Sequence, residues 1–481
     1  MRQTNAAASP LPPSEVVARL DQSLPASGLY GDLESGAKGS RAPFRLSPQP
    51  IGVSPATLDR IERLGPLLAD FYRAAGRLYQ DSVRGNVAGW PAKLLDAGKS
   101  EFVISLARRN RLRNRFPLVI RPDLMLTEQG AILATELDSV PGGLGVLQAL
   151  RDGYSRAGLE SVGAPLAESF KSGLVAQAGI GDPFVAIVVS EEGDAYRPEL
   201  TALAEELCRL GLRCRAVWPD EMEFDDAGVW LGAPGRGPKV DLIYRFFELF
   251  DLENVPGAES MFKAMQARQV VITPPPRAPL EEKLLLALFH HPELTGFWER
   301  QLGDDSFAAL RQHLPPTWVI DPTPLPPFAA IDPPLTSAGR PVRRWRDLCG
   351  ATQRGRRMVI KPSGFSPQAW GSRGVTIGHD VPAPEWGDAL EAAMVAFEQS
   401  PHVLQPYFAS RRFSVQWFDM DQNRLRDSRV RGRFSPYFID SGEDVQLAGI
   451  LATACPDSSK ILHGMADAVM APVAQDPESP L

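Results

Sequence analysis

Four charged residues lie on two neighbouring stretches of β character that a turn at 128–130 separates. Arg121 and Asp123 belong to the first stretch, and Glu136 and Asp138 belong to the second. Because side chains alternate along a strand, each pair shares one face of its strand. Three carboxylates on paired strands offer the hard oxygen ligands that magnesium takes together with substrate phosphates. This spacing predicts a metal site formed by Asp123, Glu136 and Asp138.

An exposed polar sheet face would explain the same acids without a metal. Two features favour the metal site. Apolar residues such as Leu124 and Leu133 stand between the acids, which indicates that the hairpin is embedded in a core. The sequence VPGGLG comes soon after Asp138 and predicts a flexible glycine loop next to the acids.

A nucleotide signal begins at an apolar strand, residues 358–362, whose Lys361 stands near its end. The following loop contains Gly364, Gly371 and Gly374, which allow backbone N–H groups to approach phosphates. The pattern GxxxxGK[ST] does not occur, so this is not a Walker loop. Taken alone, the stretch would equally fit a hairpin with a lysine at its rim.

The elements that must position these groups follow from the hydrophobic pattern. Residues 184–190 are an apolar run typical of a buried parallel strand, and a helical stretch and further strands follow it. Prolines 274–276 announce a helix over residues 279–294, which contains Lys283. After the glycine loop come a short strand, a helix, the strand VLQPYF, and alternating strands over 412–455.

In this order the motifs resemble the synthetase domain of glutathionylspermidine synthase, a circularly permuted ATP-grasp ligase. That family carries R-x-D on one strand, matched by Arg121 and Asp123, and then E-x-N, matched by Glu136 and Asp138 with Asp in place of Asn. The Asp138 substitution and the VPGG sequence after it depart from the family pattern. No thiol-peptidase or amidase domain is recognisable in the sequence.

The resemblance continues toward the C-terminus and covers residues 116–455. The family's aromatic-Glu pair is matched at 247–248, and its N-K-x-x-L helix is matched by Lys283 in the sequence EKLLL. The lysine of its later strand is matched by Lys361. VLQPYF resembles the ATP-grasp hinge strand along the adenine, which implies nucleotide-binding roles for Gln405 and Tyr407.

The resemblance implies the fold class and the reaction. The fold would be α+β, a glutathione-synthetase-like, circularly permuted ATP-grasp with an inserted βαβ-like subdomain and a helical N-terminal lead-in. The cofactors would be ATP and Mg²⁺, and a carboxylate would be joined to an amine through an acyl phosphate. Lys283 and Lys361 would hold the α- and β-phosphates, and Arg121 would stabilise the transferring phosphoryl group.

The pattern divides the chain into consecutive regions. They are a flexible N-terminal arm (1–50), a helical lead-in (51–115), the region of the metal-binding hairpin (116–182), a βαβ-like substrate subdomain (183–255), a nucleotide-binding part (256–470) and a tail (471–481).

Composition narrows the class of protein. The 481 residues carry a net charge of −7, with 44% hydrophobic residues, and exceed the size of a single core. A nucleic-acid binder usually has a basic balance, so we expect no nucleic-acid partner and interpret the arginine-rich stretch 108–115 as a solvated helix end. No apolar run of about 18 residues occurs, and the cysteines form no CxxC pair. We expect a soluble, cytoplasmic protein with no membrane partner.

Two C-terminal features are open to more than one interpretation. Arg429, Arg431 and Arg433 alternate on one strand face, which suits a bound carboxylate or phosphate as well as a plain solvated strand. His463 fits a capping or core histidine better than a general base.

Two other functions compete with the ligase. A phosphotransferase would stop after phosphoryl transfer, and a nucleotide-binding partner protein would perform no chemistry. The identity of both substrates and the oligomeric state are left open by the sequence.

Overall fold

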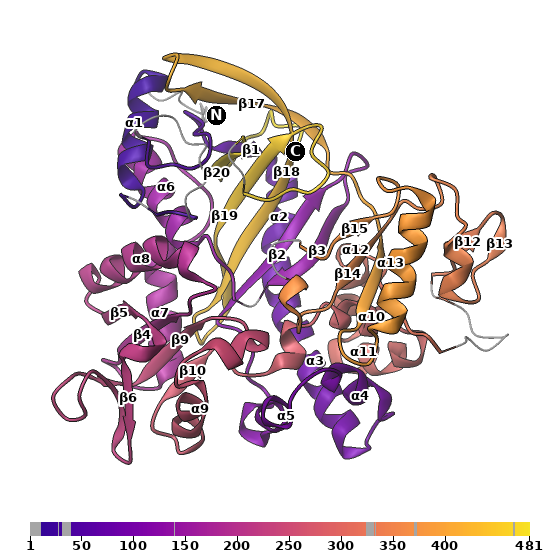
Figure 1. Cartoon of the computed structure of the whole chain (residues 1–481). Helices are drawn as coiled ribbons and strands as arrows, with labels where there is room; N and C mark the ends of the chain where they lie inside the picture. Colours follow the sequence, from indigo (N-terminus) through magenta and orange to yellow (C-terminus); the bar gives the residue numbers. More distant parts are fainter. Residues whose placement is uncertain are drawn as a thin grey trace.

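The computed structural model describes residues 11–26, 28–30, 40–138, 140–323, 331, 333–369, 373–464 and 467–481. Helices and several β-sheets make up this part of the chain (Figure 1). In the view of Figure 1 the largest sheet lies in the middle, a parallel sheet lies to its left, and a small antiparallel sheet lies to its right. These three sheets carry the residues singled out above.

The central sheet joins the predicted hairpin to the C-terminal strands. Its order is β1-β20-β19-β18-β2-β3, and β17 pairs with the free part of the long strand β18. The hairpin β2–β3 is confirmed, with its turn at Gly130 in the left-handed region. The strands are β1 (Ile51–Val53), β2 (Val119–Leu126), β3 (Ile132–Asp138), β17 (Arg412–Asp419), β18 (Arg424–Asp440), β19 (Val445–Pro456) and β20 (Val469–Gln475).

The second sheet is parallel and has the order β10-β9-β4-β5. The apolar run predicted as a buried strand is its strand β4, where residues 185–189 are buried because helices cover the sheet. The strands are β4 (Phe184–Val189), β5 (Arg213–Val217), β9 (Leu242–Phe246) and β10 (Val271–Thr273). A small neighbouring sheet consists of β6 (Met222–Asp225), β7 (Gly228–Leu231) and β8 (Lys239–Val240).

The third sheet is antiparallel and carries Lys361 and Gln405 on adjacent strands. Its order is β11-β16-β14-β15, and α13 packs against β14. The strands are β11 (Trp318–Val319), β14 (Met358–Pro362), β15 (Thr376–Ile377) and β16 (His402–Pro406), and a separate pair is formed by β12 (Thr336–Ser337) and β13 (Arg340–Pro341).

The helices cover the sheets with their apolar faces. Helix α3 buries thirteen of its residues and ends at Gly85, which adopts the left-handed conformation of a helix C-cap. The helices are α1 (Pro13–Ser23), α2 (Pro55–Glu62), α3 (Leu64–Arg84), α4 (Trp90–Asp96), α5 (Glu101–Ala107), α6 (Leu144–Arg156), α7 (Leu166–Ala178), α8 (Arg197–Arg209), α9 (Ala258–Gln266), α10 (Leu284–His290), α11 (Thr295–Leu302), α12 (Asp304–His313) and α13 (Ala383–Val395).

The two ends of the chain are folded where they are described, so the flexible arm and the tail are wrong in those parts. Helix α1 packs on α6, where a Cβ on Gly153 would come within 2.8 Å of Leu20. At the other end, β20 runs to Gln475 and pairs with β1, and the carbonyl of Leu481 accepts the N–H of Ser54 at 2.8 Å. The scattered prolines and the distance in sequence between the paired strands β1 and β20 hid these elements.

Two other boundaries lie elsewhere than expected. The parallel sheet takes in β10 and so extends beyond residue 255. Strand β18 pairs with β2 of the hairpin, and β19 and β20 continue the same sheet, which is separate from the sheet that carries Lys361. The lead-in contains α2–α5 but starts with strand β1.

Arginines 108, 109, 111, 113 and 115 are exposed, as a solvated stretch requires. Among the described residues, no helix has both the length and the apolar character needed to cross a membrane.

Helix α1 offers a direct test of the N-terminal packing. Leu20 is fully buried, so Leu20→Ala should lower the free energy of unfolding by about 2–5 kcal/mol, measured by urea denaturation. The exposed Gln22→Ala on the same helix should change it by less than about 0.5 kcal/mol. Equal, small effects of both substitutions would contradict the packing of α1.

Candidate functional site

The three main sheets meet around a cavity of about 590 Å³. The hairpin β2–β3 contributes one wall, and β14 and β16 contribute another. A third wall comes from the residues that follow the carboxyl ends of β4 and β9. Parallel strands commonly present ligand-binding residues at this end.

The cavity brings together most residues predicted from the sequence. They are Arg121, Asp123, Glu136, Asp138, Lys283, Lys361, Gly364, Gln405 and Tyr407. Gly374 is not among its lining residues, and a Cβ there would meet the ring of Pro362 at 2.7 Å, so this glycine serves packing. Gly371 lies outside the described residues. The roles assigned to all of these residues stay predictions.

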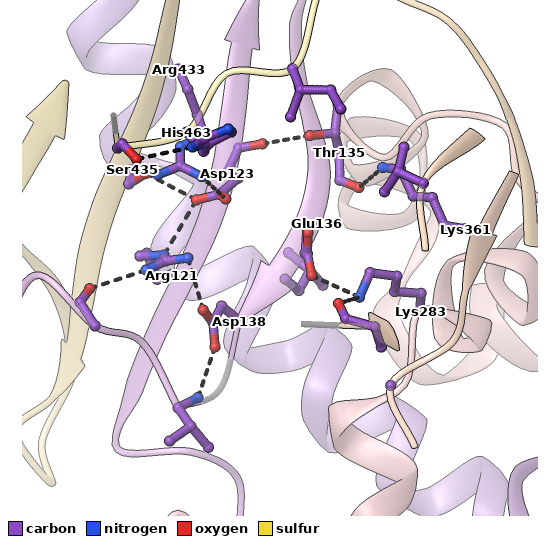
Figure 2. A pocket seen from close by; sticks show the side chains of 18 of the residues that line it. Arg121, Asp123, Thr135, Glu136, Asp138, Lys283, Lys361, Arg433, Ser435 and His463 are labelled. Carbon is purple, nitrogen blue, oxygen red and sulfur yellow. Dashed lines mark hydrogen bonds and ion pairs between the residues drawn. The ribbon is translucent and has the colours of Figure 1, made fainter. Parts of the chain in front are cut away.

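Arg121 lies between two of the three acids of the hairpin (Figure 2). The pairing places Arg121 opposite Asp138 and Asp123 opposite Glu136, with a bulge after Asp123. The guanidinium of Arg121 is 3.3 Å from Asp123 and 2.8 Å from Asp138. Asp123 also pairs with Arg433 at 3.0 Å and accepts the Ser435 hydroxyl at 2.9 Å. Both partners come from β18, and the sequence did not identify them as partners of Asp123.

The third acid, Glu136, faces the lysines (Figure 2). Its carboxylate is 2.8 Å from the ammonium group of Lys283, which also donates to the carbonyl of Ala369 at 3.3 Å. Lys361 donates to the carbonyl of Thr135 at 3.1 Å. Lys361 is therefore half-buried against the hairpin, and the alternative of a lysine at an open rim is wrong.

These pairings show what the three acids contact, and the metal site that they would form stays a prediction. Each of Asp123, Glu136 and Asp138 is in contact with at least one cation, and the described residues hold no group of three His, Cys, Asp or Glu side chains placed to bind a metal. The acids share one cavity, but their oxygens are directed at arginine and lysine. Sequence alternation predicted the common face and could not predict the cations from other elements.

Burial by itself would raise the pKa of Asp123, Glu136 and Asp138, and the neighbouring charges decide the direction of each shift. For Asp123 and Glu136, the paired cations outweigh burial, and both pKa values lie below the ordinary value. For Asp138, burial together with the like charges of Glu136 and Asp123 outweighs Arg121, and the pKa is raised. Among the hairpin acids, Asp138 is thus the one whose charge is compensated least.

The pKa values of the two lysines are shifted in opposite directions. Burial lowers the pKa of Lys361 to about 8, because the nearby acids only partly offset the loss of water. For Lys283, the adjacent Glu136 outweighs burial and the pKa is raised. A bound anion would therefore find one lysine already paired and the other, Lys361, incompletely compensated.

The glycine loop after Asp138 is held in place rather than flexible in its described part. The carbonyl of Gly142 accepts the Tyr437 hydroxyl at 2.6 Å and Arg121 at 3.1 Å. The N–H of Gly143 donates to Glu199 at 2.7 Å, and Val146 N–H donates to the same carboxylate at 2.9 Å. A Cβ on Gly142 would lie 2.2 Å from the Tyr196 ring. Glycine here permits close packing.

Glu199 was not predicted as a site residue, although the sequence contains a signal for it. It stands four residues before Leu203 and eight before Leu207, on the buried face of α8. A carboxylate on the apolar face of a helix requires partners, and here they are the N–H groups at the start of α6. Burial raises the pKa of Glu199 to about 7.

A second pair of acids, Glu248 and Glu281, lines the cavity near the parallel sheet. Glu248 follows β9, and Glu281 ends the 3₁₀ turn Ala278–Glu281 and pairs with the buried Arg245. Burial and repulsion from Glu281 raise the pKa of Glu248 well above the ordinary value. This end of the cavity also contains the side chains of Phe247 and Phe250.

The three C-terminal arginines of strand β18 have different surroundings. Arg433 lines the cavity, whereas Arg431 donates to the carbonyls of Ser410 and Asp457, and Arg429 is exposed. His463 lies at the cavity and is exposed. Gln405 is buried and donates to the Thr317 hydroxyl at 2.9 Å, which leaves the role of its side chain toward a nucleotide a prediction.

The arrangement of sheets and cavity defines a mixed α/β protein with a glutathione-synthetase-like fold. No protein-family model matches the chain, and no curated protein matches it. Among solved structures, the chain is similar to a glutathione synthetase-like effector from Globodera pallida in its apo form. The TM-score is 0.56 at 11% sequence identity, and the alignment covers 96% of each chain. This similarity shows that the chain has a glutathione-synthetase-like fold.

A second solved structure is more distantly similar. It is a protein from Methylobacillus flagellatus provisionally named γ-glutamylcysteine synthetase, with a TM-score of 0.41, 10% identity, and coverage of 83% of this chain and 85% of that one. So low a score carries no further argument. The circular permutation and the resemblance to glutathionylspermidine synthase stay predictions.

Glu199 should make stability depend on pH. Its pKa is about 7 in the fold, against 4.5 ordinarily, so the folded protein binds the proton more tightly. The stabilisation is complete below about pH 4.5 and is lost as pH rises through 7. Between pH 5 and pH 8, wild type should lose about 2–3 kcal/mol of unfolding free energy relative to Glu199→Gln, which does not titrate. Parallel pH profiles in urea denaturation would contradict this assignment.

Proposed function

We propose that the protein is an ATP- and Mg²⁺-dependent ligase that joins a carboxylate to an amine through an acyl phosphate. One observation carries the proposal: the hairpin acids and Arg121 line a single cavity together with Lys283 and Lys361, and both lysines contact the hairpin. Acids for a hard cation and cations for phosphates are the two groups that phosphoryl transfer from ATP requires. The glutathione-synthetase-like fold supports the same reaction class.

The residues fit magnesium by their donor chemistry. Asp123, Glu136 and Asp138 supply carboxylate oxygens from adjacent positions of one hairpin. Magnesium is commonly held by one or two carboxylates together with substrate phosphates, so a preformed group of three is not required. The raised pKa of Asp138 indicates a place where added positive charge would stabilise the carboxylate. When bound, the ion would neutralise phosphate oxygens.

The side chains of the cavity would share the work on the substrates. Lys283 and Lys361 hold the α- and β-phosphates of ATP, and Arg121 stabilises the transferring phosphoryl group. An oxygen of the substrate carboxylate attacks the γ-phosphorus, and the bond to ADP breaks. The amine nitrogen then attacks the acyl carbon, phosphate leaves, and the amine releases a proton. The products are an amide, ADP and phosphate.

The two ends of the cavity suit different substrate groups. Glu248 and the aromatic rings beside it form an end that favours an amine, because an ammonium group would stabilise the carboxylate form of Glu248, whose pKa is raised, and ring faces attract a cation. Arg433 lies at the hairpin, where a carboxylate would be close to the phosphoryl donor. The amine would therefore enter from the parallel sheet.

The function is tested in two stages. ATP with Mg²⁺ should raise the melting temperature, because a ligand at a hundredfold excess over Kd adds about 2.7 kcal/mol of stability. Mixtures of carboxylates and amines are then assayed for ATP-dependent phosphate release, with mass spectrometry of the products. ADP, phosphate and an amide are expected. A phosphorylated product that gives no amide would indicate a phosphotransferase, and binding without turnover of any mixture would indicate a nucleotide-binding partner protein.

The hairpin acids give a second prediction. Glu136→Gln keeps the shape of the side chain and removes the charge, so ATP turnover should fall by about a hundredfold or more while the protein stays folded. Glu128→Gln at the exposed turn of the same hairpin is the matched control and should retain wild-type turnover. Full activity of Glu136→Gln would remove Glu136 from the site.

A further inference from the structure

Glu282, next to the cavity lysine Lys283, is a buried acid with partners from two other segments. Its side chain and that of Lys99 are each 2% exposed, and they form an ion pair. The same carboxylate accepts the Ser363 hydroxyl and, at 2.8 Å, the N–H of Gly364. Three donors from two segments therefore converge on one carboxylate.

These contacts join the two segments that carry the cavity lysines. Ser363 and Gly364 stand two and three residues after Lys361, and the Ser363 oxygen also accepts the N–H of Leu284 at 3.2 Å. The backbones touch: a Cβ on Gly364 would lie 1.8 Å from the carbonyl oxygen of Glu281. The distance between Lys361 and Lys283 is thus fixed by contacts that do not involve their two ammonium groups.

Lys99 comes from a third part of the chain, the turn between α4 and α5. Its ammonium group lies 4.8 Å from the centre of the Phe365 ring, so it contacts the glycine loop as well as Glu282. The turn is held by Gly98, where a Cβ would be 1.8 Å from the carbonyl oxygen of Gln399. Among the described residues, the ion pairs place no other cation on Glu282. A carboxylate buried to this degree needs such a cation.

We infer that Lys99 and Glu282 are positioning residues that hold the loop 363–369 against the segment of Lys283 and so place both lysines for the nucleotide phosphates. This inference rests on the proposed function for its consequence, though not for the contacts themselves. Without Lys99, the buried carboxylate of Glu282 loses its ion-pair partner and turns toward water. This movement weakens its bonds to Ser363 and Gly364, and the loop loses its anchor.

Hydrogen exchange of the nucleotide-free protein tests the contacts. Lys99→Met should speed exchange in peptides covering 363–369 by about tenfold or more. The exposed Lys93→Met on α4 is the control and should leave it unchanged. Lys99→Met/Glu282→Gln should return exchange close to wild type, because no charge is buried and the side-chain amide oxygen at position 282 still accepts from Gly364. If Lys99→Met does not fold, Ser363→Ala takes its place and should also speed exchange.

ATP titration of the same proteins tests the consequence. The Kd should rise about tenfold in Lys99→Met and recover in the double variant. A purely structural pair would lower the melting temperature and leave both loop exchange and ATP affinity at wild-type values, which would overturn the inference. Absence of ATP binding in wild type would overturn the proposed function instead, and loop exchange would still decide the role of Lys99.

Discussion

Charged side chains can be buried around the cavity only because opposite charges reach them from other elements of the chain. Asp123 of β2 is compensated by Arg433 of β18, and Glu136 of β3 is compensated by Lys283 ahead of α10. An isolated charge buried as deeply as Asp123, whose side chain is 7% exposed, would cost several kcal/mol. The hairpin consequently stays in place only when the central sheet, the third sheet and the segment before α10 are assembled around it.

This constraint also prepares the cavity for an anionic ligand. Lys361 has a backbone carbonyl as its hydrogen-bond acceptor, and burial lowers its pKa to about 8. A phosphate close to Lys361 would restore the charge balance that burial disturbs, and charge-assisted contacts of this kind are stronger than neutral ones. The acids of the hairpin keep the cations of the cavity in position until such a ligand arrives.

Local patterns predicted much of the fold and the shared face of the hairpin acids. Alternation located β2 and β3, apolar runs located β4 and β14, and helical spacing located α8 and α13. Partners distant in the chain could not be predicted. Arg433 lies 310 residues from Asp123, and Lys99 lies 183 residues from Glu282. The sequence predicts a flexible glycine loop because the residues that fix it, Tyr437 and Glu199, come from other elements.

Calorimetric titration of ATP with Mg²⁺ into wild type and Lys361→Met tests the central claim most directly. The loss of one charge-assisted contact to phosphate, about 1.5–3 kcal/mol, should raise the Kd roughly ten- to a hundredfold. Lys93→Met should bind ATP as wild type does, because this lysine is exposed on α4. Equal affinities of wild type and a folded Lys361→Met would contradict the account of the cavity as a nucleotide site.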